Sequence, residues 1–382
     1  MAGTSTSRGF TVQVSFQLTD PPGVSLCFVH CPGRNESHFI GDPLILGGAQ
    51  ALVLLVISFT VGASHRLYGF HDYFVYKAGP GRPRLDLIPM PYPRDFDHKT
   101  VGILPLSDGD HYAVVLPVPS YNYRARSMKF SLRVFWSESK SWTTKQALLA
   151  RDSETDYLMV VEHQASRVIS VGGGVLGWVD LWNGILLCNV LDENPLMRLI
   201  QWPVEPSDEI FEFGWHLNHI SPRPYRDVSV VNGSIKFVEM KFLGDTANQV
   251  WTATIWSRMV FSREWHLSST LHTDDISITD SILMNQIQLL LPEIFDEERK
   301  RLTWDQMICT SPTLSLTNDD VLHMMVSAKL EYPKTYAYLL VVNIRSRTVE
   351  ALEQYHANRV ILLEPTYIAS AFPSYLDTTT TM

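Results

Sequence analysis

The chain has few charged residues and very little cysteine. Of its 382 residues 19% are charged, and the four cysteines are Cys27, Cys31, Cys188 and Cys309. Their irregular spacing in so long a chain excludes the disulfide framework of a small secreted domain and predicts reduced thiols. The first ten residues, MAGTSTSRGF, lack the basic start and apolar core of a secretion signal. We therefore expect a cytoplasmic or nuclear protein.

An excess of basic residues is also missing. Lysine and arginine number 31 against 40 aspartates and glutamates, which gives a formal net charge of −9. No basic stretch compensates for this balance, and a phosphate backbone needs clustered lysine and arginine, so nucleic-acid binding is excluded. Hydrophobic residues make up 45% of the chain, enough for a packed core in one large or two ordinary domains.

No sequence motif of catalysis is present. The chain has no G-x-S-x-G, no P-loop, no H-E-x-x-H and no protein-kinase motif. Serine, histidine and aspartate are abundant, but no spacing singles out a triad. We therefore predict no enzyme, no catalytic residue, no cofactor and no metal ligand, while a hydrolase built from carboxylates far apart in sequence stays open.

One long stretch lacks charge altogether. Leu44–Ala63, LILGGAQALVLLVISFTVGA, is about as long as a membrane span. Gly47 and Gly48 interrupt it, and the residues after them are rich in the β-branched and aromatic types that favour strands. We interpret the stretch as a buried strand or strand pair, and we expect no membrane association.

Short alternating strands fill most of the sequence. Val168–Pro203 contains three or four of them, with Asn183-Gly184 as a tight turn, and Asp227–Met240 repeats the pattern around Asn232-Gly233. Such dipeptides suit the positive φ angles of a type I′ hairpin. A second hairpin follows each copy, so the repeating unit has four strands. This predicts an all-β, β-propeller-like fold of about five or six four-stranded blades, with a β-sandwich as the alternative.

The remaining segments complete the predicted organisation. Tyr157–Glu162 is expected to be a strand. Apolar residues at helical spacing within 276–291, followed by a charged run, predict a short helical or irregular insertion near 276–308. We predict a single domain over residues 11–376, with flexible ends at 1–10 and 377–382.

Two groups of residues match parts of known binding motifs. Gly172 to Gly177 matches the letters of a dinucleotide fingerprint, but a strand follows where a helix is needed, so we interpret the glycines as a strand-connecting turn. Cys27, His30 and Cys31, with His38 nearby, lack the second ligand pair of a structural zinc site.

Other polar and aromatic residues are also interpreted structurally. His216 and His219 precede a Ser-Pro that ends any helix, which favours a loop over a metal site. The adjacent carboxylates of Asp274-Asp275 and Asp319-Asp320 point apart on a strand end, so they are expected to be turn residues rather than a glycosidase pair. Most tryptophans are expected to pack between blades, although some could line a binding face. Those of the middle third are Trp178, Trp182, Trp202, Trp215, Trp251, Trp256 and Trp265.

Several long sequence segments resemble a known family. WVDLWNGILLCNVLDENPLMRLIQWP, then RDVSVVNGSIKFVEM and WTATIWSR, are similar to the grass proteins of domain of unknown function 1618. DPPGVSLCFVHCPG, SPTLSLTNDDVLHMM and YLLVVNIRSRTVEAL extend the resemblance over about residues 11–376, with its core near 168–271. The resemblance implies a plant source and carries no established activity, cofactor or site residue. The second hairpins also resemble, more weakly, the propellers associated with plant F-box proteins.

These observations favour an interaction module without catalysis, which binds a protein partner through loops at the blade ends. Two alternatives stay open: an enzyme or small-ligand receptor with a site at the mouth of the propeller channel, and a substrate adaptor in protein turnover. A pocket with converging Asp, Glu or His side chains would favour the enzyme or receptor. A flat, aromatic, uncharged face would favour the interaction module. The sequence does not define the oligomeric state.

Overall fold

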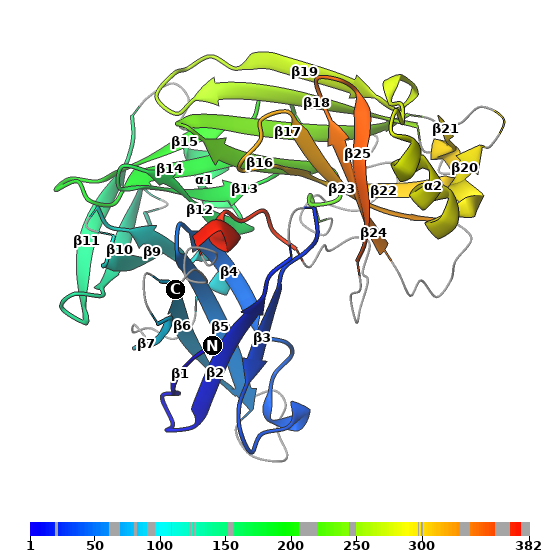
Figure 1. The fold of residues 1–382 in the computed structure, drawn as a ribbon. Coiled ribbons are helices and arrows are strands. Elements are labelled where there is room, and N and C mark those ends of the chain that lie inside the picture. The colour runs from blue at the N-terminus through cyan, green and yellow to red at the C-terminus, as the bar shows by residue number, and fades with distance from the viewer. Residues whose placement is uncertain are drawn as a thin grey trace. The chain divides into compact units, whose positions relative to one another are not determined.

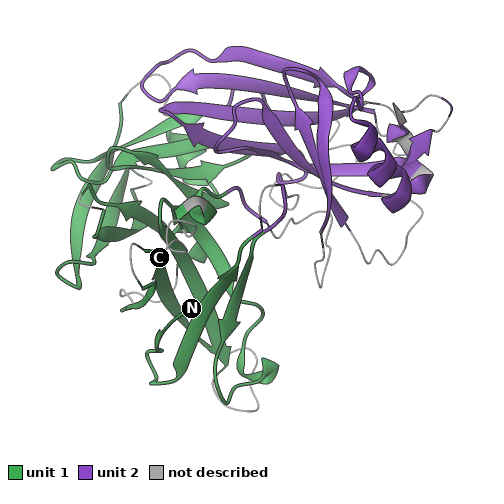
Figure 2. Ribbon diagram, viewed as in Figure 1, with its two compact units in different colours: residues 1–18, 25–201, 370–382 green, residues 19–24, 202–369 purple. Residues whose placement is uncertain are grey.

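The computed structural model is built almost entirely from antiparallel strands (Figure 1). It describes residues 1–19, 22–60, 69–79, 82–89, 96–107, 109–122, 124, 127–151, 156–205, 221–243, 250–296, 298, 301–328, 337–355 and 367–375. The chain divides into two compact units (Figure 2). Unit 1 comprises residues 1–18, 25–201 and 370–382, and unit 2 comprises residues 19–24 and 202–369. The single domain expected over 11–376 stays a prediction.

Four-stranded meanders are the repeating element of the fold. Among the described residues there are three separate four-stranded sheets, and an eight-stranded sheet that joins two more meanders through one parallel contact between β11 and β15. In each meander consecutive strands are neighbours, which is the organisation of a propeller blade. The predicted all-β, β-propeller-like fold with about five or six blades is therefore confirmed.

Unit 1 holds a three-stranded sheet and three meanders. The three-stranded sheet consists of β1 (Ala2–Ser5), β2 (Thr11–Gln17) and β3 (Leu26–His30). The first meander is β4 (Leu44–Ala49), β5 (Leu52–Thr60), β6 (Gly69–Lys77) and β7 (Arg84–Ile88). The second is β8 (Gly102–Pro105), β9 (Tyr112–Asn122), β10 (Ser127–Trp136) and β11 (Ser141–Leu149). The third is β12 (Arg167–Gly172), β13 (Val175–Asp180), β14 (Gly184–Asn189) and β15 (Leu196–Gln201).

The first strands of these three meanders, β4, β8 and β12, contact one another. Two glycines face Val168 of β12. A Cβ on Gly102 would lie 2.7 Å from Val168 Cγ1, and a Cβ on Gly47 would lie 3.4 Å from the Val168 carbonyl oxygen. The absence of a side chain at Gly102 therefore lets β8 pack closely on β12, whereas a Cβ at Gly47 would make only ordinary van der Waals contact.

Unit 2 holds two meanders and the insertion. The first meander is β16 (Arg226–Val231), β17 (Ser234–Leu243), β18 (Val250–Met259) and β19 (His266–His272). The second is β22 (Met307–Leu314), β23 (Val321–Ala328), β24 (Ala337–Asn343) and β25 (Thr348–Tyr355). Between them lie helix α2 (Ser281–Leu290) and the short pair β20 (Phe295–Asp296) and β21 (Arg301–Leu302), so the expected insertion near 276–308 is confirmed. One hydrophobic core, which includes Trp251, Leu283 and Leu340, joins both meanders and α2.

Short 3₁₀ turns connect several of these elements. They are η1 (Glu36–His38), η2 (His98–Thr100), η5 (Thr273–Asp275), η6 (Pro292–Ile294), η7 (Trp304–Gln306) and η8 (Phe372–Tyr375).

The uncharged stretch Leu44–Ala63 is a strand pair over its described part. β4 and β5 pair in antiparallel register, and β5 is buried along most of its length. The interpretation as a strand pair is therefore confirmed for residues 44–60, but only β5 is buried, since Leu44 and Ile45 of β4 are exposed. Among the described residues, no helix has the length and apolarity to cross a membrane.

Two sequence expectations are wrong. Tyr157–Glu162 is the helix α1 rather than a strand, because the Asp156 carboxylate accepts hydrogen bonds from the backbone of Leu158 and Met159 and so caps the first turn. Residues 1–10 do not form a flexible end, since β1 pairs with β2 and places Ala2 opposite the buried Val14. The tail 377–382 lies outside the described residues.

Candidate functional site

The glycine-rich segment is a hairpin turn. Gly172 pairs with Val175, so Gly173 and Gly174 form a two-residue loop between β12 and β13, with φ angles of 61° and 88°. Positive φ at both positions defines the type I′ geometry that glycine adopts without strain. A strand follows, so no helix N-terminus is available for a pyrophosphate. The interpretation as a strand-connecting turn is confirmed.

The cysteine and histidine group does not form a cluster. Cys27 is half-buried in β3, where burial raises its pKa to about 11, and burial also raises the pKa of Cys31. His38 Nδ1 lies 2.6 Å from Asn35 Oδ1. Across the part of the chain that the structure describes, no three His, Cys, Asp or Glu side chains lie close enough to hold a metal ion.

The paired aspartates lie at turns, as expected. Asp275 forms an ion pair with Arg347 at 2.9 Å, and Asp319 forms one with Lys236 at 2.8 Å. Asp274 is exposed beside His272. The ion pairs of Asp275 and Asp319 tie neighbouring segments together.

The tryptophans mostly pack in the interior, as expected, whereas His216, His219 and Trp215 lie outside the described residues. Trp178, Trp182, Trp202 and Trp251 are buried. Trp256 and Trp265 are partly exposed.

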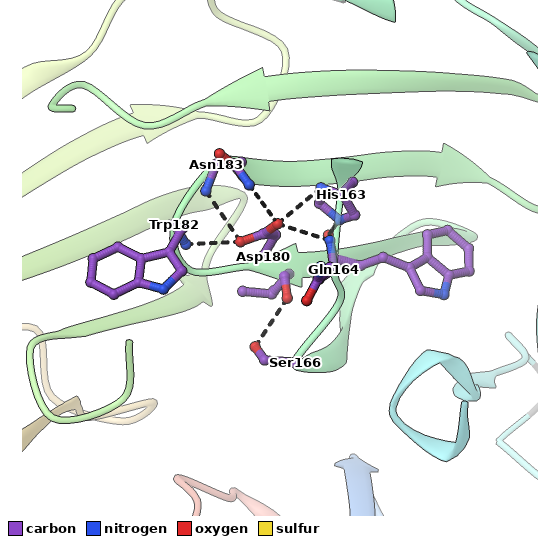
Figure 3. Close-up of polar contacts among 8 residues, drawn as sticks. His163, Gln164, Ser166, Asp180, Trp182 and Asn183 are labelled. Atoms are coloured by element: carbon purple, nitrogen blue, oxygen red, sulfur yellow. Dashed lines mark hydrogen bonds and ion pairs between the residues drawn. The ribbon is translucent and has the colours of Figure 1, made fainter. Parts of the chain in front are cut away.

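A buried aspartate that sequence reasoning missed closes the turn between β13 and β14 (Figure 3). Asp180 Oδ1 accepts the backbone N–H of Trp182 at 2.9 Å and that of Asn183 at 3.2 Å. Its Oδ2 accepts the backbone N–H of Gln164 and the Asn183 side-chain amide, both at 2.9 Å. An aspartate two residues before Trp-Asn-Gly is the signal that could have identified this turn, since Asp side chains commonly bond to the backbone two residues on.

His163 lies against the same carboxylate (Figure 3). Its Nδ1 is 4.0 Å from Asp180 Oδ2, both side chains are buried, and Nε2 contacts the Trp178 carbonyl oxygen at 3.0 Å. Burial lowers the pKa of His163, and the charge of Asp180 opposes that shift. Ser166 donates its hydroxyl to the Val179 carbonyl rather than to His163. The arrangement is therefore not a nucleophilic triad, and it fastens the end of α1 to the β13–β14 turn.

A second buried aspartate connects the first strands of the two meanders of unit 2. Asp227 of β16 pairs with Arg223 at 2.6 Å, and its other oxygen accepts the backbone N–H of Leu314 in β22 at 3.1 Å. Ser229, two residues on and therefore on the same side of β16, has a buried hydroxyl with no hydrogen-bond partner. Sequence reasoning missed both because polar residues alternating with valine resemble a solvent-facing strand.

The backbone is strained just before Leu314, the residue whose N–H bonds to Asp227. β22 has a register shift between Thr310 and Thr313, and the buried Ser311 has a φ of 59°. Tyr367 donates its hydroxyl to the Ser311 carbonyl at 3.0 Å, and its oxygen lies 3.2 Å from the Thr313 hydroxyl. A bulge, a left-handed serine and several buried polar groups form a cluster of the kind found at functional sites. We define Asp227, Ser229, Ser311, Thr313 and Tyr367 as the inner polar cluster.

Arg226, next to Asp227, pairs with Glu239 of β17. Both side chains are buried, and the Arg226 Nε donates to Glu239 Oε1 at 3.0 Å. Glu239 also lies 3.5 Å from the Lys241 ammonium. The pair joins two adjacent strands of the sheet.

A small cavity in unit 1 carries no carboxylate or histidine. Tyr73, one of its lining residues, contacts His98 through its hydroxyl. The lining residues are Tyr73, Ile88, Phe96, Val101, Val114, Leu116 and Trp142. Such walls suit apolar contact and supply no group for acid–base chemistry.

Among the described residues, three exposed apolar side chains lie close together in sequence at the β18–β19 hairpin. Phe261 is 84% exposed, and Met259 and Leu267 are exposed as well. Trp265 is partly exposed, beneath the Arg258 guanidinium at 5.9 Å. Single exposed apolar residues are ordinary, whereas contiguous apolar patches are common at contact surfaces. We define Met259, Phe261, Trp265 and Leu267 as the hairpin tip.

Two backbone hydrogen bonds anchor the turn of the hairpin tip. The Val260 N–H donates to the Gly233 carbonyl at 3.0 Å, which anchors the tip to the Asn232-Gly233 turn. Within the tip, the Ser262 N–H donates to the Met259 carbonyl at 2.9 Å. Asn232 and Gly233 have φ angles of 51° and 74°, as predicted for a type I′ turn. A surface fixed before binding loses little conformational entropy when a partner docks.

Fold and surface together define the class: an all-β protein of propeller-like four-stranded sheets. The sequence profile of the family described as "Protein of unknown function (DUF1618)" matches residues 178–323, which include the hairpin tip. This match supports the resemblance to that family over those residues. No curated protein matches the chain.

Several solved structures match the chain at low similarity. The β-propeller domain of Nup133 from Vanderwaltozyma polyspora is 8% identical, with a TM-score of 0.37, and the match covers 84% of this chain and 78% of that one. The hydrazine synthase of Kuenenia stuttgartiensis is 10% identical, with a TM-score of 0.31 and coverage of 77% and 74%. A levansucrase of B. megaterium is 10% identical, with a TM-score of 0.29 and coverage of 97% and 90%. At these scores the matches carry no argument about function.

Proposed function

We propose that the chain is a non-enzymatic protein-interaction module whose hairpin tip binds a partner protein. The observation that carries the proposal is Phe261, a large aromatic side chain that is 84% exposed on a turn anchored by backbone hydrogen bonds. Aromatic side chains held in place before docking are typical binding anchors. The buried carboxylates Asp180 and Asp227, in contrast, accept several hydrogen bonds from their own chain.

Affinity purification with and without the anchor tests this function. The full chain is used as bait beside Phe261→Ala and Leu267→Asp, and Phe28→Ala serves as the matched control because Phe28 is an exposed phenylalanine on β3. Loss of an anchor residue costs about 2 kcal/mol, so recovery of the partner should fall roughly thirtyfold for Phe261→Ala and stay unchanged for Phe28→Ala. Absence of any partner that depends on Phe261 would refute the proposal.

The inner polar cluster favours a second candidate function, a small-ligand receptor or enzyme. Its specific support is the buried hydroxyl of Ser229, which has no hydrogen-bond partner, and the positive φ of the buried Ser311. Thermal-shift screening against sugars and small carboxylic acids tests it. A ligand that raises the Tm of the natural chain but not of Ser229→Ala would favour this function, with the exposed Ser268→Ala as control.

We also propose a grass source and family membership beyond residues 178–323, supported by the sequence segments outside that range. A cytoplasmic or nuclear location is proposed on the four free cysteines, three of which are buried. A fluorescent fusion expressed in leaf cells tests the location, and accumulation in the secretory pathway would contradict it.

A further inference from the structure

The two Asn-Gly pairs of the chain differ in how firmly each is held. Asn183 is half-buried and donates its side-chain amide to Asp180 Oδ2 at 2.9 Å. Its backbone N–H donates to the other oxygen of the same carboxylate at 3.2 Å. Gly184 is buried and pairs with Asp180 on one side and with Gln201 on the other. Both residues of this turn are therefore fixed by contacts on several sides.

The pair Asn232-Gly233 is open. It forms the loop between β16, which ends at Val231, and β17, which begins at Ser234. The Asn232 side chain is exposed and makes no hydrogen bond to any residue that the structure describes. A Cβ on Gly233 would lie 3.9 Å from Met259 Cε, so the surroundings leave room for the backbone of the loop to move. The same two amino acids are thus locked at one turn and unrestrained at the other.

Asparagine is a thermolabile residue, and a following glycine exposes it to attack by the main chain. The backbone nitrogen of Gly233 attacks Cγ of Asn232, because glycine has no side chain to hinder the approach. A new C–N bond forms, the bond from Cγ to the side-chain nitrogen breaks, and ammonia leaves with the proton of the attacking nitrogen. Water then opens the succinimide ring. Addition at one carbonyl gives aspartate, and addition at the other gives isoaspartate, in which the main chain runs through the former side chain.

We propose that Asn232 is a site of spontaneous deamidation, and that its isoaspartate product releases the anchor of the hairpin tip. The Gly233 carbonyl accepts the Val260 N–H at 3.0 Å. Isoaspartate adds a methylene to the main chain, so the loop no longer has the two-residue type I′ geometry that places this carbonyl. Aspartate, in contrast, tolerates the φ of 51° at this position and keeps the turn.

Asn183 reacts much more slowly, although glycine follows it too. Its amide must first leave the Asp180 carboxylate, and hydrogen bonds to a charged group are among the stronger ones. Gly184 must also leave its pairings with β13 and β15 before its nitrogen can turn toward Asn183. Loss of a single hydrogen bond to a carboxylate already corresponds to a rate ratio of at least about tenfold between the two sites.

Peptide mapping by mass spectrometry tests the site. The full chain is incubated in mildly alkaline buffer and digested with trypsin, which releases residues 227–236 with Asn232 as their single asparagine and residues 168–198 with Asn183. We expect amide loss at Asn232 to be at least about tenfold faster than at Asn183. In concentrated urea the two rates should become similar, because only the fold distinguishes them. Equal rates in the folded chain overturn the proposal, and so does a difference that persists in urea.

Hydrogen exchange tests the release of the anchor. The deamidated fraction carries an added negative charge, so ion exchange separates it from the unreacted chain. Exchange at the Val260 amide should be roughly fivefold faster in the isoaspartate form, since one hydrogen bond is lost. The matched control Asn232→Asp has the same charge with a normal main chain and should exchange as the natural chain does. Unchanged exchange in the isoaspartate form, or equal acceleration in Asn232→Asp, overturns the proposal. Partner capture is not a readout here, so failure of the proposed function leaves these results unaffected.

Discussion

Replacing Asp180 should destabilise unit 1 strongly, because its carboxylate accepts several hydrogen bonds from buried groups. Asp180→Ala removes the acceptor of three backbone N–H groups, those of Gln164, Trp182 and Asn183, and of the Asn183 amide. Each buried donor left without a partner costs about 1 to 3 kcal/mol, and water that enters the space recovers part of that cost. We expect a total loss of about 3 to 5 kcal/mol. Asp180→Asn keeps one acceptor oxygen and should lose roughly half as much.

Urea denaturation followed by tryptophan fluorescence measures this loss, since the buried Trp178 and Trp182 adjoin the turn. With a denaturant dependence of about 3 kcal/mol per M, the midpoint for unit 1 should fall by roughly 1 to 1.7 M in Asp180→Ala. The control is Asp274→Asn, an exposed aspartate beside His272, which should change stability by less than about 0.5 kcal/mol. If Asp180→Ala unfolds within about 1 kcal/mol of the natural chain, the carboxylate does not hold the turn and the reasoning fails.

Three further predictions concern other buried groups. Burial lowers the pKa of His163 in the folded chain, so the unfolded chain binds a proton first as the pH falls. The free energy of unfolding should therefore decrease below about pH 6.5. In urea denaturation at several pH values, His163→Gln should reduce this pH dependence by up to about 1.4 kcal/mol per pH unit. Arg226→Met leaves Glu239 buried without its arginine and should cost about 3 to 5 kcal/mol, whereas adding Glu239→Leu should recover most of that loss in the same assay. Gly184→Ala should lower the free energy of unfolding by about 3 kcal/mol or more, because φ is 153° there and a Cβ would clash with the Ile200 carbonyl oxygen. At Gly173 a Cβ would meet no other atom, so Gly173→Ala should lower it by only about 1 kcal/mol. Thermal unfolding measures both.

The sequence predicts those structural features that depend on residues adjacent in the chain, such as turns and alternating strands. The Asn232-Gly233 turn and the alternating strands beside it were predicted correctly, because a type I′ turn needs only two residues that tolerate positive φ. Asn183-Gly184 lies at a predicted turn, yet the turn is closed by the carboxylate of Asp180 three residues before Asn183. Tyr157–Glu162 was assigned as a strand from its apolar run, although Asp156 was present as a capping signal.

The buried polar groups could not be predicted in the same way. Asp227 receives its backbone hydrogen bond from Leu314, 87 residues further along the chain. Without that partner the aspartate resembles a solvent-facing residue of an alternating strand. His163 has no local sequence signal, because its interaction with Asp180 depends on how α1 meets β13. Exposure of Phe261 and Ile282 likewise depends on which neighbours cover them, and hydrophobicity alone predicts burial for both.

The close approach at Val168 has a consequence for how unit 1 unfolds. In repeat architectures each element normally contacts only its neighbours, so one repeat can open while the others remain folded. Here a single valine of β12 touches a glycine from each of two other meanders, Gly47 of β4 and Gly102 of β8. Opening any one of the three meanders exposes the surfaces of the other two at that point. The amides around Val168 should therefore exchange with deuterium together and only in a cooperative opening of all three meanders.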